Sequence, residues 1–513
     1  MKDKLRIQSS HSWLYAMGGL LFMILIAVFI IRQEKAYLPD SERTVIVGQV
    51  LEPPHLDPTA GSAAAIGEIV HANIFEGLTR INAQGEVLPG LAESWLISSD
   101  GLVHLFNIRK DVLFHDGQLL TVHDIKDSLE NIIAPKSINP QKHLFQMISD
   151  VEILDETRII IRLEKPSNRF LFNLGLPAAV IVSHDRQIDN KTNPVGTGPF
   201  IFSRWSRGDR IELKRNSAYW GDEAFLERVV FRFIPDPTAA LAGLLSGDID
   251  IFPSYPAPET LIRIERDSRL LYSVGATQGK TILAINNERP FLNDIRVRRA
   301  LAHAVDRSIV IRDSQNNVAL PIGSHFSPME KGYVDLTGLY PPDMEKAKSL
   351  MAEAGAEALS LRLVVPPPAY ARRSSEVVAY QLEKTGIRIS IEQVEWAEWL
   401  SRVFHGKDYD LTIVAHVEPF DLDIYARDNY YFGYHSAHYQ EIYQKLASEQ
   451  NVNEQIRLIE EAQITIADDC VNVFLFLLPK ISVWNKDIDG VWKDAPIPAN
   501  VMSEIRWKEK TNP

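Results

Sequence analysis

A glycine-rich run between Gly275 and Thr281, GATQGKT, has residue types suited to phosphate binding. A phosphate-binding loop needs four residues between its first glycine and the Gly-Lys pair, and this run has three. The loop must also open a helix, whereas Ile282 to Ile285 has the apolar pattern of a strand. We therefore expect a turn that precedes a strand here, and not a nucleotide site.

Histidine spacing is the second feature with chemical potential. His435 and His438 form a His-x-x-His pair, and His416 lies upstream. A closed zinc site uses four nitrogen or sulfur ligands, and a lone histidine pair is most often at the surface, so we expect no metal to bind through these residues. The chain also lacks a Gly-x-Ser-x-Gly elbow and a His-Glu-x-x-His helix. We expect a binding protein without a cofactor, and not an enzyme.

Composition narrows the partners. The 513 residues include 54 basic and 67 acidic side chains, a formal charge of −13, with no long basic cluster. Nucleic acid is therefore excluded as an expected partner. A chain of this length needs more than one hydrophobic core. Cys470 is the only cysteine and adjoins the apolar run Val471 to Leu478, so we expect a buried, inert thiol.

An apolar segment near the N-terminus predicts a membrane anchor. Trp13 to Ile31 contains 19 residues without a charge, about 28 Å as a helix. No small-x-small cleavage site follows it, and Arg32 begins a charged run directly. An uncleaved anchor is favoured over a removed signal. The charges on the two sides are balanced and leave the orientation open.

The elements that would position a site have clear local signals. Trp95 to Ile97 and Leu102 to Ile108 predict a hairpin around an Asp-Gly turn, and Thr121 with Asp124 predicts a capping box. Farther on, one helix is expected over Asp294 to Arg312, and Thr238 is expected to cap another. A strand-helix-strand pattern favours a parallel sheet: Leu361 to Pro366, Ser374 to Lys384 and Ile387 to Val394.

Several longer runs resemble one known family, the family 5 extracytoplasmic solute-binding proteins of peptide- and nickel-type ABC importers. The run LAESWLISSDGLVHLFNIRKDVLFHDG at Leu91 to Gly117 is similar to the family signature. The other matching runs occur in family order: His71 to Leu78, Asn193 to Phe200, Ile234 to Ile251, Asn286 to Arg307 and Val394 to Leu400.

The resemblance implies an α/β, two-lobe periplasmic-binding-protein fold of type II with an extra subdomain, preceded here by one transmembrane helix. The expected organisation is a cytoplasmic tip (1–12), the anchor or uncleaved signal (13–31), lobe I (44–283, with an accessory subdomain at 79–191), lobe II (284–477) and a return to lobe I (478–513). The chain is expected to cross between lobes near Thr281 to Asn287 and again at Val471 to Leu478.

By matching position, the resemblance also implies which residues line a cleft between the lobes. From lobe I the expected segment is Thr59 to Ser62. The expected residues of lobe II are Arg372, Trp396, Trp399, His416, Glu418, Asp421 and Tyr425. For either tryptophan alone, packing in the core is an equal alternative. For Arg372 and Arg373, the alternative is a place at the solvent-exposed start of a helix.

The sequence departs from the family at one place. Peptide-binding members carry an aspartate shortly before an Asp-Pro or Glu-Pro pair, and it captures the peptide ammonium. Here Val414, Ala415 and His416 precede Glu418-Pro419. Asp421 is the first choice as a substitute, with Glu418 and Asp423 as alternatives.

The expected function is capture of a small peptide or similar polar solute and its delivery to an ABC permease. The protein would be a monomer anchored in the cell membrane, with its large domain on the extracytoplasmic side. Two alternatives remain open. The same fold could bind a metal chelate, haem or opine-like solute, or it could serve as a sensor or chaperone domain without a permease.

Overall fold

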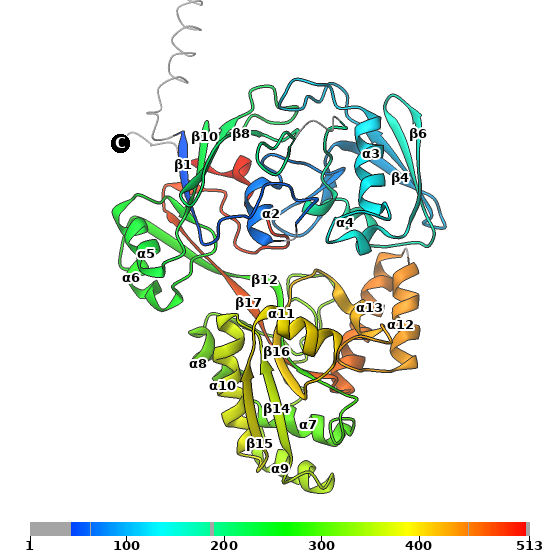
Figure 1. Ribbon diagram of the computed structural model, residues 1–513, viewed down its shortest axis with the longest axis vertical. Helices are drawn as coiled ribbons and strands as arrows, with labels where there is room; N and C mark the ends of the chain where they lie inside the picture. The colour runs from blue at the N-terminus through cyan, green and yellow to red at the C-terminus, as the bar shows by residue number, and fades with distance from the viewer. Residues whose placement is uncertain (1–42, 62, 185–188, 450, 509–513) are drawn as a thin grey trace, which may run out of the picture.

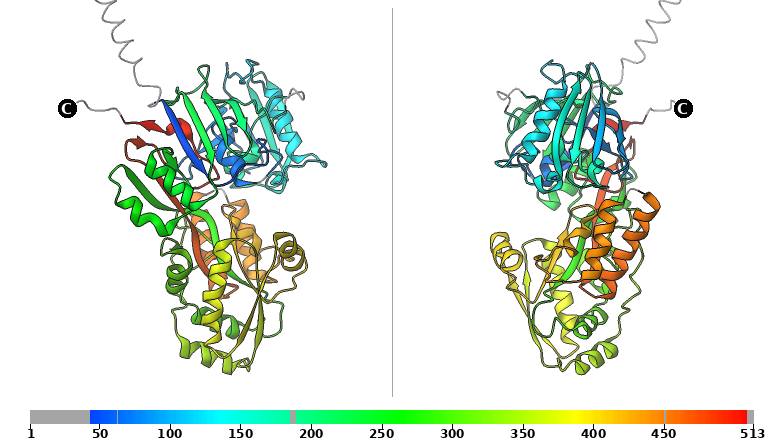
Figure 2. Two further views of the ribbon diagram at one scale, coloured as in Figure 1. Left: turned by 60° about the vertical axis from the view of Figure 1, so that its left-hand side comes forward. Right: turned by 90° about the vertical axis from the view of Figure 1, so that its right-hand side faces the viewer.

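The computed structural model describes residues 43–508, except 62, 185–188 and 450. Two bodies, lobe I above and lobe II below, are joined by two long strands (Figures 1 and 2). These strands, β12 (Leu270–Ile285) and β17 (Asn472–Asn485), pair antiparallel along most of their length. They lie at the centre of a sheet with the order β15-β14-β16-β12-β17-β11-β1-β10-β9-β8, so one sheet runs through both lobes.

The lobe I part of this sheet begins with β1 (Thr44–Gln49), which is parallel to its neighbours β10 and β11. Val45 and Val47 point from β1 into a buried cluster, as the alternating pattern requires. Short helices complete the lobe. The bounds are β8 (Phe200–Ser206), β9 (Arg210–Arg215), β10 (Arg228–Phe233), β11 (Ile251–Phe252), α2 (Ala64–Val70), α5 (Pro237–Ser246) and α6 (Leu261–Glu265).

A smaller sheet of four antiparallel strands, ordered β4-β5-β7-β6, lies to one side of lobe I with helix α3 against it (Figure 1). The predicted hairpin is confirmed as β4 paired with β5, and the capping box at Thr121 and Asp124 is present. The bounds are β4 (Ala92–Ile97), β5 (Val103–Ile108), α3 (Val122–Ile133), β6 (Ile148–Asp155), β7 (Arg158–Leu163) and α4 (Phe170–Asn173). A separate pair consists of β2 (Thr79–Ile81) and β3 (Val87–Pro89).

A buried carboxylate joins motif segments of lobe I. Glu76 accepts hydrogen bonds from Thr197 Oγ1, Tyr219 OH and Trp220 Nε1 at 2.8–2.9 Å. Burial raises the pKa of Glu76, while these three donors act in the opposite direction. The glutamate of HANIFEGL and the threonine of NPVGTGPF therefore hold the lobe together.

Lobe II continues the sheet with three strands, β14 (Ser360–Val365), β15 (Arg388–Gln393) and β16 (Leu411–His416), in which β14 is parallel to both neighbours. The predicted parallel strand-helix-strand unit is confirmed, with α10 (Ala369–Glu383) as its helix. The other helices are α7 (Ile295–Ala304), α8 (Arg307–Gln315), α9 (Met344–Glu353), α11 (Trp396–Trp399), α12 (Ala437–Ser448) and α13 (Val452–Asp468). The short strand β13 (Leu320–Pro321) pairs with β17, whereas the short strands β18 (Ile488–Asp489) and β19 (Arg506–Trp507) pair with each other in lobe I.

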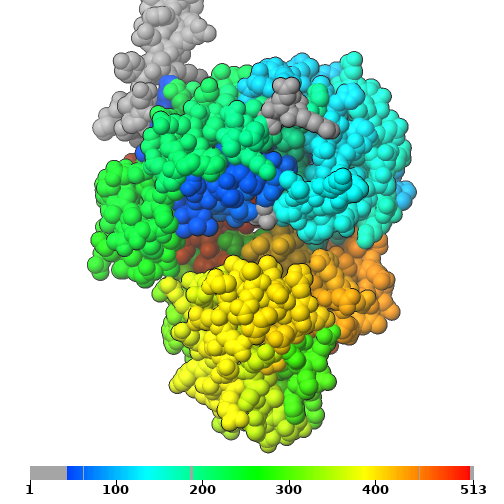
Figure 3. Space-filling view, viewed as in Figure 1, coloured from blue at the N-terminus to red at the C-terminus, as the bar shows by residue number. Residues whose placement is uncertain are grey.

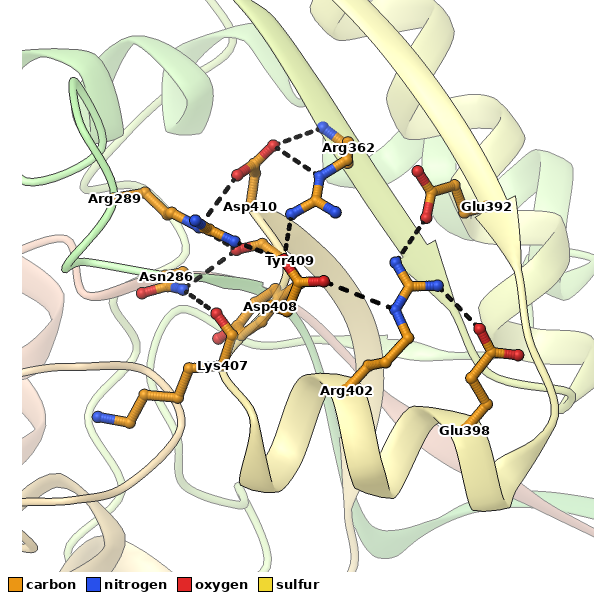
Figure 4. A network of polar contacts seen from close by, with 10 residues as sticks. All are labelled: Asn286, Arg289, Arg362, Glu392, Glu398, Arg402, Lys407, Asp408, Tyr409 and Asp410. Carbon is orange, nitrogen blue, oxygen red and sulfur yellow. Dashed lines mark hydrogen bonds and ion pairs between the residues drawn. The ribbon is translucent and has the colours of Figure 1, made fainter.

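An ion-pair network fixes the segment after α11, a π-helical turn at Leu400–His405 (Figure 4). Arg402 contacts Glu392 and Glu398, each at 2.8 Å. Asp408, at the entry to β16, contacts Arg362 at 2.7 Å and Arg289 at 2.9 Å. These pairs tie β14, β15 and β16 to the segment that carries Trp396 and Trp399.

Three local predictions are wrong. Gly275 to Thr281 is not a turn: it lies within β12, whose register with β17 shifts between Ala276 and Lys280. The helix expected over 294–312 is two helices, because the Asp306 side chain accepts from Ser308 N and Ile309 N and starts α8. Asp236, not Thr238, caps α5, with Pro237 in its first turn.

The anchor predicted at Trp13 to Ile31 and the tip at 1–12 lie outside the described residues. Among the helices of the described chain, none has the length and apolar character needed to cross a bilayer. The buried thiol is confirmed: Cys470 is 1% exposed, and burial raises its pKa to about 12.

Candidate ligand-binding cleft

The carboxyl ends of β14, β15 and β16 form one edge of the lobe II sheet, because β14 is parallel to both other strands. Ligands of open α/β sheets bind at this kind of edge. Figure 3 shows a hollow between the upper lobe and the yellow part of the lower lobe. Three segments leave the edge: Pro366 to Tyr370, Val394 to Trp399 and Val417 to Tyr425.

The segment after β16 meets lobe I. The Phe420 ring lies 5.4 Å from the Phe172 ring, edge to face, and the Arg169 guanidinium lies 5.2 Å from the Phe420 ring centre. Phe420 has a φ of 55°, a left-handed conformation that is strained for a side chain with a Cβ. Its neighbours Val417 and Glu418 are exposed. This segment therefore forms one of the contacts between the lobes and also presents side chains to solvent.

The two predicted tryptophans have different environments. Trp399 is 4% exposed, belongs to a buried cluster of lobe II, and donates from Nε1 to Thr412 Oγ1 at 3.0 Å. Trp396 is 43% exposed and contacts the Trp399 ring edge to face, at 5.5 Å between centroids. Trp396 is thus the tryptophan available to a ligand, and Trp399 supports it from the core.

Arg372 and Thr59 lie in different lobes, Arg372 in lobe II and Thr59 in lobe I. Arg372 lies in the first turn of α10, with its guanidinium 3.7 Å from the Glu395 carboxylate. Thr59 turns back onto Asp57, whose carboxylate accepts from the Thr59 amide at 2.9 Å and its hydroxyl at 2.6 Å. Thr59 also lines a lobe I pocket of about 340 Å³ beside α3. Ser62, predicted with it, lies outside the described residues.

Two of the other predicted residues, Asp421 and Tyr425, lie in a buried network. His325 Nε2 lies 3.0 Å from Asp421 Oδ2, and Tyr425 OH lies 3.1 Å from His325 Nδ1. Asn472 Nδ2 donates to Tyr425 OH at 3.1 Å. The other carboxylate oxygen, Asp421 Oδ1, is 2.7 Å from the Lys280 ammonium. A ligand ammonium at Asp421 would have to displace one of these partners.

The donor and acceptor of each hydrogen bond in this network can be assigned by starting from Asn472. Asn472 Oδ1 accepts from the Ile285 amide at 3.0 Å, which fixes the Asn472 amide nitrogen toward Tyr425. Tyr425 accepts this bond and donates its own proton to His325 Nδ1. The proton of His325 is therefore on Nε2 and points to Asp421. The segment after β16 is thereby tied to both crossing strands, β12 and β17.

Charge in the network is confined to one pair. Burial lowers the pKa of His325, and it lowers the pKa of His416 to about 3, so both rings are neutral at pH 7. Burial acts to raise the pKa of Asp421, but His325 and Lys280 outweigh it and hold that pKa well below its usual range. An ionised Asp421 thus faces an ammonium and two neutral imidazoles.

Three of these residues also have the side-chain types of a metal site. Ligand atoms of His325, His416 and Asp421 lie within 4.8 Å of one another. The proton on His325 Nε2 occupies the place of a metal, and moving it to Nδ1 would leave the Tyr425 hydroxyl proton without its acceptor. The network therefore suits hydrogen bonding better than metal coordination.

His416 and His435 have separate partners. His416 Nε2 faces Tyr431 OH at 2.9 Å, whereas His435 contacts Glu288 at 3.2 Å on the surface. Sequence reasoning missed Lys280 and His325, which contact Asp421 from 141 and 96 positions away. No local spacing signals such a contact.

Comparison with known proteins identifies the family. Residues 86–438 match the model described as bacterial extracellular solute-binding proteins, family 5, middle region. The chain belongs to this family. The dipeptide-binding protein of Escherichia coli K12 is 30% identical over 358 residues, 63% of this chain and 66% of that protein. The nickel-binding periplasmic protein of the same strain is 28% identical over 293 residues, 55% of this chain and 56% of that protein.

Two solved structures share the fold. A Helicobacter pylori binding protein, DppA, in complex with the peptide STSA has a TM-score of 0.77 at 23% identity, covering 92% of this chain and 99% of that one. HbpA2 of Haemophilus parasuis has a TM-score of 0.82 at 22% identity, covering 91% of this chain and 100% of that one. The two-lobe α/β fold is confirmed, and the chain is a binding protein, not an enzyme.

Proposed function

We propose that this family 5 protein captures a small peptide or similar polar solute between its lobes and delivers it to an ABC permease outside the cytoplasm. The observation that carries the proposal is that Trp396, Arg372 and Glu418 each follow a strand of one sheet edge that faces lobe I, with Arg372 in the first turn of α10. The exposed aromatic face of Trp396 and the guanidinium of Arg372 suit a ligand with both apolar and acidic groups. The peptide-bound relative of the same fold supports this ligand class.

A test of this function is mass spectrometry of the small molecules released when the purified protein is denatured. We expect peptides or peptide-like solutes in stoichiometric amount. Release of a metal chelate or haem would favour the second candidate, which the relatives named nickel-binding periplasmic protein and heme-binding protein A support. The internal pairing of Asp421 with Lys280 also favours it, because the buried acid of the segment after β16 is then already paired with a cation of the chain.

The anchor is part of the proposal. We infer that Trp13 to Ile31 stays attached and holds the protein at the outer face of the cell membrane, because its uncharged length suits a bilayer and no cleavage site follows. The full-length protein is expected in the membrane fraction with its original N-terminus. N-terminal sequencing that begins near residue 37 would contradict this.

Closure of the lobes is the expected mechanism. We propose lobe boundaries at 44–283 and 478–513 for lobe I and 284–477 for lobe II, with β12 and β17 as the hinge. The register shift between Ala276 and Lys280 interrupts their ladder and provides a place to bend. Solution scattering should show a smaller radius of gyration once ligand is bound. An unchanged radius with a confirmed ligand would contradict closure.

A further inference from the structure

Lys280 is a buried lysine directly beneath the segment that faces the cleft. Its side chain is 1% exposed, and its ammonium lies 2.7 Å from Asp421 Oδ1. The same ammonium donates to the main-chain oxygen of Glu418 at 2.6 Å. Glu418 and Asp421 flank Phe420, which touches lobe I. The lysine therefore binds both ends of a short stretch that contacts lobe I.

Asp421 has no free oxygen for a ligand. Oδ1 faces Lys280, and Oδ2 accepts from His325 at 3.0 Å. A buried carboxylate is a strong partner for a cation only while its charge is uncompensated. Here the chain supplies the compensating cation from the crossing strand β12, 141 residues earlier in the sequence.

The other acids near this edge are also engaged or exposed. Glu395 is 3.7 Å from Arg372, and Asp423 forms an ion pair with Arg427. Glu418 is exposed to solvent, where a charge pair contributes little. Among the described acids of the segments that follow β15 and β16, none is therefore both buried and free of a cation.

We propose that Lys280 determines ligand specificity by acting as a built-in counter-cation, so that the ligand group placed beside Glu418 and Phe420 carries no positive charge. The inference rests on the proposed binding of a solute in the cleft and narrows its class. The ligand is an N-acylated peptide or another solute without a free amine at this end. An α-ammonium would bring a second cation to a carboxylate that already has one.

The test uses the full-length protein and two matched probes, the dipeptide Ala-Phe and its N-acetylated form, titrated by calorimetry. Wild type should bind the acetylated dipeptide at least as well as the free one. Lys280→Met keeps the side-chain length and removes the ammonium, so Asp421 becomes available. This variant should prefer the free dipeptide by about tenfold or more, because a charge-assisted contact is then possible.

Two further variants separate specificity from folding. In Lys280→Met with Asp421→Asn the carboxylate is gone, and the preference for the free amine should disappear. Lys480→Met removes another buried lysine, which donates to the main-chain oxygens of Trp492 and Asp494. It should lower the unfolding temperature without changing the preference. If Lys280→Met does not fold, Lys280→Gln replaces it.

Each result has a defined meaning. A wild-type protein that binds free Ala-Phe tenfold more tightly than the acetylated form overturns the inference. Binding by wild type without any gain of amine preference in Lys280→Met or Lys280→Gln overturns it as well, and leaves the proposed function intact. If no variant binds either dipeptide and denatured wild type releases no small molecule, the proposed function fails and the inference fails with it.

Discussion

Asp421→Asn should lower the free energy of unfolding by about 3–5 kcal/mol, the usual cost of removing one partner of a buried ion pair. The change leaves the Lys280 ammonium, 1% exposed, without the negative charge that faces it, while the Glu418 carbonyl still accepts its hydrogen bond. It also replaces a charged acceptor of the His325 proton with a neutral amide. Urea unfolding followed by tryptophan fluorescence measures the loss as a lower midpoint at constant m-value.

The pH dependence gives this prediction a sign. The folded-state pKa of Asp421 is lowered by His325 and Lys280, although burial alone would raise it. Its contribution is therefore complete above the unfolded pKa of about 4 and is lost as the pH falls toward the folded value. The stability difference between wild type and Asp421→Asn should be largest near pH 7 and should shrink below about pH 4.

Asp423→Asn is the matched control, because Asp423 is two residues away in the same short helical turn. Its carboxylate pairs with Arg427 near the surface, with side chains 27% and 48% exposed. Exposed pairs contribute about 0–1 kcal/mol, so this change should have a small effect. Equal losses for both variants, or a loss below about 1 kcal/mol for Asp421→Asn, would show that Lys280 and Asp421 are not a coupled buried pair.

Much of the fold could be predicted because its signals are local. The capping box at Thr121 and Asp124 lies within four residues, and the parallel unit around α10 follows from alternating strand and helix periods. The break between α7 and α8 at Asp306 could not be predicted, because its local signal is ambiguous. An apolar stripe continues across 294–312, and the Asp306 cap that interrupts it has the same sequence appearance as a solvated acid in a helix.

The site could be predicted only as a set of segments. Motif positions indicated the edge that carries Arg372, Trp396 and Glu418, and the structure places all three there. The sequence could not show that Asp421 faces inward, because its partners Lys280 and His325 come from distant elements. Burial and charge pairing across 96 to 141 residues have no period or spacing to detect.

Trp399→Ala should lower the free energy of unfolding by about 3–5 kcal/mol, because it empties a large volume in the lobe II core and removes the donor to Thr412. Trp396→Ala should cost less than about 1 kcal/mol in stability, since its ring is 43% exposed, yet it should weaken binding of the released ligand if that ligand stacks on the ring. Unfolding and titration of both variants separate the two roles. The two variants are matched, because the ring centroids lie 5.5 Å apart and the two side chains differ mainly in burial. A Trp396→Ala protein that is as unstable as Trp399→Ala would place both rings in the core. A stable Trp396→Ala protein with unchanged affinity would remove Trp396 from the ligand surface.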